Sequence, residues 1–216
     1  GPGRLPLLRL PGHEVIEEIA RGGMGIVYRA RQLRPAREVA LKMLLPHQLG
    51  SPDVAQRFEL EASALAELDH PAILPVYQSG THDGMPFFTM KLALGGTLAA
   101  RRDQLAGQWP SIAGLLVEVA GAVHFAHEHG VLHRDLKPGN ILFDERGRLY
   151  VSDFGLAKLL GTSSSLTRSI DLLGTPHYMA PEVAEGSARQ ATIASDVYSL
   201  GAILFELLAG RTPFEA

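Results

Sequence analysis

The sequence predicts an α+β protein in which a strand-rich N-terminal part precedes a mainly helical C-terminal part. Three observations lead to this class. Short strand patterns separated by Gly and Pro fill the chain up to about residue 94, one amphipathic helix interrupts them, and longer helical patterns follow Gly95-Gly96. The N-terminal part should therefore form a five-stranded antiparallel sheet with one helix.

Five runs rich in β-branched or alternating apolar residues predict the strands of this sheet. The first three follow one another closely and predict a meander, and the last two flank the turn at residues 81–84. The expected strands are Glu14–Ala20, Ile26–Arg31, Glu38–Leu44, Ile73–Gln78 and Pro86–Leu92.

Apolar residues spaced three or four apart predict the helices. The pattern over Pro52–Leu68 gives the helix of the N-terminal part. In the C-terminal part, the pattern over Ile112–His129 predicts a long, mostly buried helix. A second buried helix is expected over Thr192–Ala209, with Gly210 ending it.

The rest of the C-terminal part combines short strands with polar strings. Strand patterns at Val131-Leu132, Ile141–Phe143 and Leu149–Val151 surround the polar string His133–Asn140, which favours chemistry over core packing there. Residues Leu156–Leu173 have little periodicity and many Ser and Thr, which predicts a long loop, and such loops are often functional.

Composition narrows the class of protein. The hydrophobic share of 46% supplies a real core, and a net charge of −3 argues against a dedicated nucleic-acid binder. The absence of Cys excludes disulfides, thiolate zinc sites and Cys nucleophiles, and it suits a reducing compartment. No apolar stretch is long enough to predict a membrane span.

Lys and Asn are scarce: the 20 basic residues include only 4 Lys, and Asn140 is the single Asn. A sequence that avoids these residue types suggests that the ones it keeps were hard to replace. The positions of the four Lys and of Asn140 are therefore candidates for functional sites.

A glycine cluster lies between the first two expected strands, at Gly22, Gly23 and Gly25. Glycines allow backbone N–H groups to approach phosphate oxygens and allow the positive φ that a tight hairpin needs. Taken alone, such a hairpin is more often a simple turn, and the Walker pattern GxxxxGK[ST] is absent.

Lys42 ends the string VALK in the third expected strand. Lysine is seldom buried unless its ammonium group is paired, and Glu61 on the following helix is a candidate partner. Together they could hold a nucleotide phosphate. A solvated lysine on an edge strand is the alternative.

The string HRDLKPGN carries the strongest chemical signal. Asp135, Lys137 and Asn140 can converge from one loop as proton acceptor, phosphate clamp and metal ligand. Asp153 follows within the string Asp-Phe-Gly, and two oxygen ligands, from Asn140 and Asp153, suit Mg²⁺. A solvated charged loop is the weaker reading.

In order and spacing, GGMG, VALK, Glu61, HRDLKPGN, DFG and GTPHYMAPE (Gly174–Glu182) resemble the motifs of eukaryotic-type protein kinases, specifically bacterial Hanks-type serine/threonine kinases. The resemblance covers about residues 13–216. Lys137, two residues after the Asp, is the serine/threonine form of the loop. Two of the scarce lysines and the single Asn thus fall on motif positions.

The resemblance implies a bilobal protein-kinase-like fold. Residues 1–12 would be an N-terminal extension, residues 13–93 the N-lobe with its five-stranded sheet and one helix, and residues 94–216 a mainly helical C-lobe without its final helices. Without them, Glu182 would lack the Arg that normally pairs with it. This segment alone is therefore expected to be unstable or inactive unless the chain continues.

The resemblance also implies ATP and Mg²⁺ as cofactors and assigns roles to residues. Asp135 would accept the proton of the substrate hydroxyl, Lys137 would contact the γ-phosphate, and Lys42, oriented by Glu61, would hold the α- and β-phosphates. The metal ligands would be Asn140 and Asp153. Phe154, His133, Leu65 and Val76 would stack in a hydrophobic spine that links the lobes.

The implied nucleotide site has three parts. Glycines would cover the phosphates, apolar side chains would sandwich the adenine with Met90 as gatekeeper, and the main chain at Lys91 and Ala93 would bind the adenine edge, Lys91 through its carbonyl. The implied residues are Ile19, Gly22, Gly23, Gly25, Val27, Ala40, Lys42, Met90, Lys91, Ala93 and Leu142.

Regulation is implied by Arg134, because an Arg before the catalytic Asp marks kinases whose activation loop is ordered by phosphorylation. We expect autophosphorylation within Thr162–Ser169. Thr175 should instead contact the polar string His133–Asn140, which we call the catalytic loop. The expected regulatory residues are Arg134, Ser165, Thr167, Ser169 and Thr175.

The expected function is transfer of the γ-phosphate of ATP to Ser or Thr of protein substrates, with a dimer as one route to autophosphorylation and no nucleic-acid partner. The expected location is the cytoplasm, either as a free enzyme or as the cytoplasmic domain of a protein anchored in the membrane beyond Ala216. Two alternatives remain: a pseudokinase scaffold, favoured by Ala20 in place of the first loop glycine, and a small-molecule phosphotransferase, disfavoured by GTPHYMAPE.

Two further groups of side chains, one of histidines and one of arginines, carry weaker signals. The histidines at 124, 127, 129 and 133 are interpreted as structural, since only His124 and His127 share a helix face and zinc needs three or four ligands. Arg101-Arg102 and the group of Arg31, Arg34 and Arg37 are expected to be solvated surface, with docking as the lesser alternative.

Overall fold

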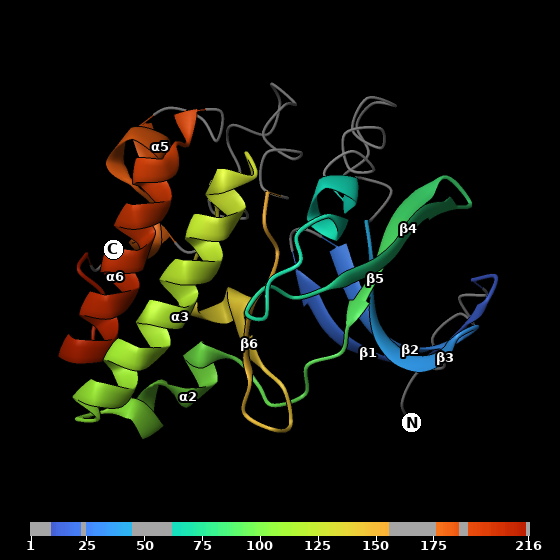
Figure 1. Ribbon diagram of the computed structural model, residues 1–216, viewed down its shortest axis with the longest axis horizontal. Helices are drawn as coiled ribbons and strands as arrows, with labels where there is room; N and C mark the ends of the chain where they lie inside the picture. The colour runs from blue at the N-terminus through green and yellow to red at the C-terminus, as the bar shows by residue number, and fades with distance from the viewer. Residues whose placement is uncertain (1–9, 23–24, 45–61, 156–175, 186–189, 215–216) are drawn as a thin grey trace. The chain divides into compact units, whose positions relative to one another are not determined.

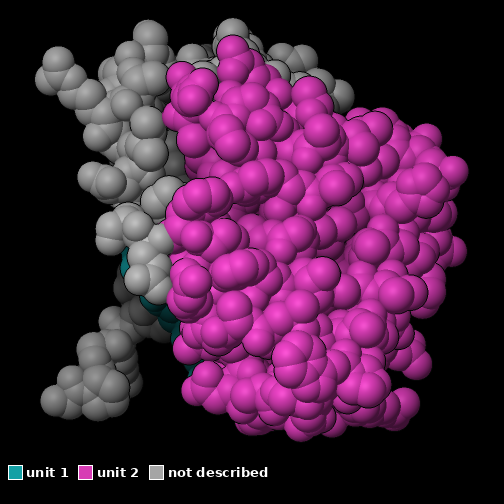
Figure 2. All heavy atoms as spheres, turned by 90° about the vertical axis from the view of Figure 1, so that its left-hand side faces the viewer, with its two compact units in different colours: residues 1–66, 75–92 teal, residues 67–74, 93–216 magenta. Residues whose placement is uncertain are grey.

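The computed structural model describes residues 10–22, 25–44, 62–155, 176–185 and 190–214. The chain packs as two compact units. Unit 1 comprises residues 1–66 and 75–92, and unit 2 comprises residues 67–74 and 93–216. In Figure 2 the atoms of unit 2 form one continuous mass.

Unit 1 contains a five-stranded antiparallel sheet (Figure 1), which confirms the predicted architecture. The strand order is β1-β2-β3-β5-β4, so the first three strands form the predicted meander. The strands are β1 (His13–Gly22), β2 (Gly25–Leu33), β3 (Ala36–Met43), β4 (Val76–His82) and β5 (Met85–Lys91).

One face of this sheet carries the core of unit 1. Alternate residues of β2 and β3 point to the same face, and these side chains are buried together with residues from β5 and from the segment before β1. The cluster consists of Leu10, Ala30, Val39, Leu41, Met43 and Phe87.

The fourth strand begins later than the sequence predicts, at Val76 and not at Ile73. Ile73 belongs to unit 2, where it forms an isolated bridge with Val151. The turn before β5 is also tighter than expected, because Asp83 and Gly84 alone connect the strands, both with positive φ. Of the helix expected over 52–68, residues 62–68 are described, and 62–66 of these are helical.

Unit 2 is built around two long helices that lie side by side (Figure 1), α3 (Trp109–Glu128) and α6 (Ile193–Ala209). Both were predicted. Two shorter helices, α2 (Leu98–Leu105) and α5 (Pro181–Glu185), were not. Gly210 ends α6 with φ 71° and donates its N–H to the carbonyl of Glu206, as the sequence indicated.

A small hairpin of β6 (Ile141–Phe143) and β7 (Leu149–Val151) follows the polar string, as predicted. The expected strand at Val131-Leu132 is absent from this described stretch. The N–H of Val131 instead donates to the carbonyl of Ala126 and closes the end of α3.

Among the described residues, α3 alone is long and apolar enough to cross a membrane, by length and composition only. The core helix of a globular unit passes the same test. In this chain α3 packs against α2, α6 and β7 within unit 2.

Candidate active site

The sheet of unit 1 brings four of the expected nucleotide-site residues onto one face. Paired residues of antiparallel strands point to the same side, and residues two apart in a strand share that side. Val27 pairs with Lys42, and Ala40 pairs with Met90. Val27, Ala40, Lys42 and Met90 therefore line a common face.

The glycine hairpin closes between Gly22 and Gly25, which are paired in the β1-β2 register. Gly25 has φ 123°, and a Cβ there would overlap the carbonyl oxygen of Met43. Only glycine fits this position. Ala20, the departure from the family pattern, pairs with Val27 directly after an irregularity in the register between Glu18 and Ala20.

Lys42 is buried in β3, with 5% of its surface exposed, although the sequence left open a solvated position. A buried ammonium group requires polar partners, which supports a role beyond packing. Lys91 donates its N–H to the carbonyl of Pro75 at 3.0 Å, so the role expected for it falls on its carbonyl. Ile19 is partly exposed on β1.

Two of the expected nucleotide-site residues lie in unit 2. Ala93 is its first residue after β5, and Leu142 pairs with Tyr150 in the β6-β7 hairpin. Several expected residues lie outside the described part of the chain: Gly23, Glu61, Ser165, Thr167, Ser169 and Thr175.

The polar string of unit 2 brings three expected catalytic residues together. Nζ of Lys137 lies 2.7 Å from Oδ2 of Asp135. Nδ2 of Asn140 donates to the carbonyl of Asp135 at 2.7 Å and reaches its Oδ2 at 3.3 Å. A carboxylate that accepts from an ammonium group and an amide is held in one orientation.

Asn140 also joins this loop to the segment that carries Asp153. The carbonyl of Asn140 accepts from the N–H of Ser152 at 2.9 Å and from its hydroxyl at 3.1 Å. Because Nδ2 of Asn140 faces Asp135, its Oδ1 faces away and can serve as a ligand. Amide and carboxylate oxygens are the ligands that Mg²⁺ prefers, so these residues fit that ion.

Asp153 adopts a left-handed backbone conformation, with φ 62°. The next residue, Phe154, is buried, and its ring lies 4.7 Å from that of His133. The predicted stacking of these two rings is therefore observed. The N–H of Gly155 donates to the carbonyl of His133 at 3.1 Å and ties the two strings together.

Burial lowers the pKa of His133 below its ordinary value, and the carboxylates of Asp196, Asp135 and Asp153 offset part of this effect. A buried imidazole of lowered pKa stays neutral near pH 7. It acts as a packing group beside Phe154.

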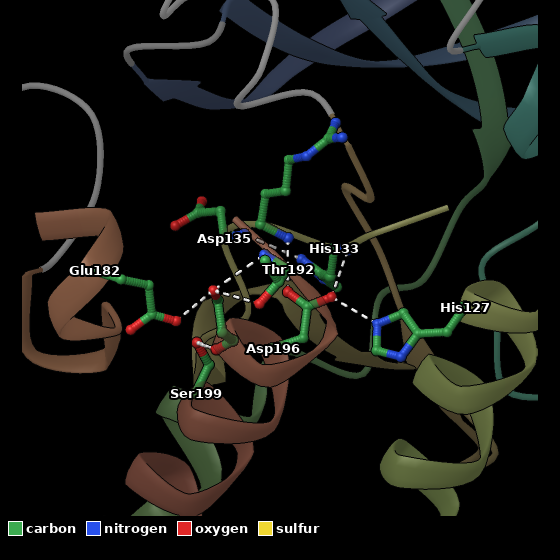
Figure 3. Close-up of polar contacts among 9 residues, drawn as sticks. His127, His133, Asp135, Glu182, Thr192, Asp196 and Ser199 are labelled. Carbon is green, nitrogen blue, oxygen red and sulfur yellow. Dashed lines mark hydrogen bonds and ion pairs between the residues drawn. The ribbon is translucent and has the colours of Figure 1, made fainter. Parts of the chain in front are cut away.

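Asp196, in the first turn of α6, holds the main chain of this loop in place (Figure 3). The sequence did not predict this role of Asp196. Its Oδ2 accepts from the N–H of His133 and its Oδ1 from the N–H of Arg134, both at 2.8 Å. Its exposed fraction is 1%. An Asp within an otherwise apolar helix pattern was the available signal, since buried carboxylates need partners.

His127 of α3 completes this group, with Nε2 at 2.7 Å from Oδ2 of Asp196. Its side chain is almost fully buried. The structural interpretation of His127 is consistent with this contact, and among the described residues no group of three or more His, Asp or Glu side chains could hold a metal ion.

The segment of residues 176–185 is attached to the same helix, α6. Oγ of Ser195 donates to Oε1 of Glu182 at 2.7 Å, and Oγ of Ser199 donates to the carbonyl of Tyr178 at 2.8 Å. Glu182, which was expected to lack its Arg partner, thus accepts a hydrogen bond from the hydroxyl of Ser195. This hydrogen bond lowers the pKa of the Glu182 carboxyl.

Unit 1, taken by itself, holds a buried lysine on a sheet whose first hairpin is closed by glycines. Unit 2, taken by itself, combines a half-buried carboxylate with an ammonium group and an amide beside it. This set is suited to phosphoryl transfer, in which positioning and charge stabilisation dominate. It defines the class of a nucleotide-dependent phosphotransferase.

Comparison with known proteins gives the family. Residues 13–216 match the protein kinase domain, so the chain belongs to the protein kinase family. Its relatives are bacterial serine/threonine kinases of the Hanks type. It is 40% identical over 205 residues to the probable serine/threonine-protein kinase PknB of Lactococcus lactis, and 36% identical over 207 residues to the serine/threonine-protein kinase PrkC of Bacillus subtilis.

These alignments cover 94% of this chain but only 32% and 31% of the two relatives. Among solved structures, the kinase domain of PknI from Mycobacterium tuberculosis superimposes with a TM-score of 0.77 and 26% identity. That match covers 99% of this chain and 80% of the PknI chain. The predicted kinase-like fold is thereby confirmed.

Proposed function

We propose that this protein transfers the γ-phosphate of ATP to Ser or Thr hydroxyls of protein substrates. The observation that carries the proposal is the group of Asp135, Lys137 and Asn140, in which the carboxylate is held by an ammonium group at 2.7 Å and by an amide. The names of the relatives, all serine/threonine-protein kinases, support the same activity.

In this proposal, the oxygen of the substrate hydroxyl attacks the γ-phosphorus, Asp135 accepts the hydroxyl proton, and ADP leaves. Lys137 neutralises charge on the transferred phosphoryl group. Asn140 and Asp153 would hold Mg²⁺, which when bound shields the negative phosphate oxygens. Asp196 fixes the main chain before Asp135, so the base keeps its orientation.

Unit 1 would supply the nucleotide-binding face. Lys42 would pair with the α- and β-phosphates, and the hairpin at Gly22 and Gly25 would cover them with main-chain N–H groups. Val27, Ala40, Met90 and Leu142 would contact the adenine, and the main chain at Lys91 and Ala93 its edge; of these residues, Ala93 and Leu142 belong to unit 2.

We further propose control by phosphorylation within Thr162–Ser169, read by Arg134, with dimerisation as one route to it. The domain would act in the cytoplasm, alone or as part of a membrane-anchored protein. Incubation with ATP and Mg²⁺ followed by peptide mapping should find phosphate in this segment. A loop without phosphate after prolonged incubation would refute this control.

The activity itself is tested by transfer of labelled γ-phosphate to a generic basic protein. The wild type should label the substrate, and Asp135→Asn should lose at least about 100-fold, the usual contribution of a general base. Equal labelling by both proteins would exclude catalysis at this site. Nucleotide binding without transfer by the wild type would favour the pseudokinase alternative.

A further inference from the structure

A second carboxylate of α6, that of Glu206, is buried away from the catalytic loop. Its exposed fraction is 5%. Its Oε2 accepts from the hydroxyl of Tyr178 at 2.6 Å, and its Oε1 accepts from Nη1 of Arg102 at 3.1 Å. A buried carboxylate is tolerated only with such partners.

The three residues come from three different elements. Arg102 lies on α2, Glu206 lies near the end of α6, and Tyr178 ends the 3₁₀ turn η4 (Pro176–Tyr178). Arg102 and Glu206 are 104 residues apart in the chain. The link therefore connects parts of unit 2 that are distant in the sequence.

The expectation of solvated surface holds for Arg102, which is exposed, and is wrong for Arg101, which is half-buried. Arg101 donates to the carbonyl of Gly95 at 2.7 Å and lies over the ring of Phe143. Arg102 is 44% exposed, but its guanidinium group reaches the buried carboxylate of Glu206. Its other partner, Asp103, is 91% exposed.

Tyr178 is held at both ends by α6. Its carbonyl accepts from Ser199, and its hydroxyl donates to Glu206. Burial raises the pKa of Tyr178 well above its ordinary value, and the hydrogen bond to Glu206 adds to this effect, so the hydroxyl remains a donor. Tyr178 belongs to GTPHYMAPE, the string expected to shape the peptide pocket.

We propose that Arg102 is a positioning residue for the substrate segment Pro176–Glu182, acting through Glu206 and Tyr178. The inference rests on the proposed kinase function. Arg102 neutralises one oxygen of Glu206 and orients the carboxylate so that the other oxygen faces Tyr178. Without Arg102, the carboxylate is free to rotate toward water, and the substrate segment loses one of its two attachments at Tyr178.

The first test is steady-state kinetics with a peptide substrate. Arg102→Met keeps the apolar stem and removes the charge, and it should raise the KM for peptide about 5-fold, as expected for a lost hydrogen bond to a charged group. The kcat and the KM for ATP should stay within about 2-fold, because Asp135 and Lys42 are untouched. Arg102→Lys should restore part of the peptide affinity.

Asp103→Asn is the matched control, because it removes only the exposed partner of Arg102. It should leave all three kinetic parameters unchanged. The proposal is overturned if Arg102→Met behaves like Asp103→Asn. It is also overturned if kcat and both KM values change together, since that pattern indicates general loss of structure.

A second test needs no catalytic activity. A double-mutant cycle of Arg102→Met and Tyr178→Phe, followed by urea unfolding, should show non-additive changes, because both residues act on one carboxylate. Additive changes would overturn the link. Should the wild type transfer no phosphate while the cycle remains non-additive, the proposed kinase function fails and the coupling through Glu206 stands.

Discussion

The two ends of α6 hold their neighbours in different ways. Near its start, Asp196 accepts from two main-chain N–H groups and contacts the buried ring of His127. Near its end, Glu206 accepts from two side chains, those of Tyr178 and the half-exposed Arg102. Main-chain donors are present whatever the side chain, so this end of α6 holds the main chain of His133 and Arg134 through one carboxylate. The substrate segment depends on side chains that substitution can change.

The largest effect is expected from Asp196→Ala. The change leaves two buried N–H groups and a buried imidazole without their acceptor, and it should lower the free energy of unfolding by about 3–5 kcal/mol. Urea titration monitored by circular dichroism measures this loss. Glu206→Ala is the comparison at the other end of α6. It should cost less, about 1–3 kcal/mol, because Arg102 can turn to water. Equal losses would remove the proposed difference between the two ends.

A smaller effect is expected from His127→Phe, which keeps the ring volume and removes one of three partners of Asp196. The two main-chain donors remain, so the loss should be about 1–2 kcal/mol. His124→Phe on the same helix is the control, because the side chain of His124 is 74% exposed. It should change stability by less than about 0.5 kcal/mol. Matching values from the two variants in urea titrations would show that the His127 contact contributes nothing.

The smallest expected effect is the dependence of the free energy of unfolding on pH, which again differs between the two ends of α6. The pKa of His133 is lower in the folded state than its value of about 6.5 in the unfolded chain. At a pH between these two pKa values, the unfolded chain therefore binds more protons than the folded protein does. Stability is therefore full above about pH 6.5 and should fall as the pH drops below it, by at most about 1.4 kcal/mol per pH unit.

His133→Phe, which preserves packing against Phe154, should remove this contribution from the pH profile of unfolding. Tyr178→Phe at the other end should leave the profile between pH 5 and 7 unchanged. A profile that keeps its full slope in His133→Phe would show that other groups cause it.

Periodicity accounts for most of the fold that could be predicted. The spacing of apolar residues located α3 and α6, and Gly210 located the end of α6. Helix α2 was missed because only Leu98 of it is buried, so it has no apolar stripe. The available signal was Thr97, whose hydroxyl accepts from the N–H of Ala100 as an N-cap.

Local strings predicted the catalytic loop, because Asp135, Lys137 and Asn140 lie within six residues of one another. The supports of that loop could not be found in this way. His127 and Asp196 are 69 residues apart, and Tyr178 and Glu206 are 28 apart. Spacing along one sequence carries no information about such contacts. Only the isolated charge of Asp196 and Glu206 in an apolar helix pointed to them.

The left-handed backbone of Arg134, with φ 66°, has a consequence for protein engineering. A non-glycine residue in this conformation costs about 1 kcal/mol, and glycine adopts it without that cost. A search for thermostable variants would therefore select Arg134→Gly and, for the same reason, Asp153→Gly, where φ is 62°. Both substitutions delete side chains on which the proposed chemistry and its control depend. Stability screens of this protein should therefore hold both positions constant.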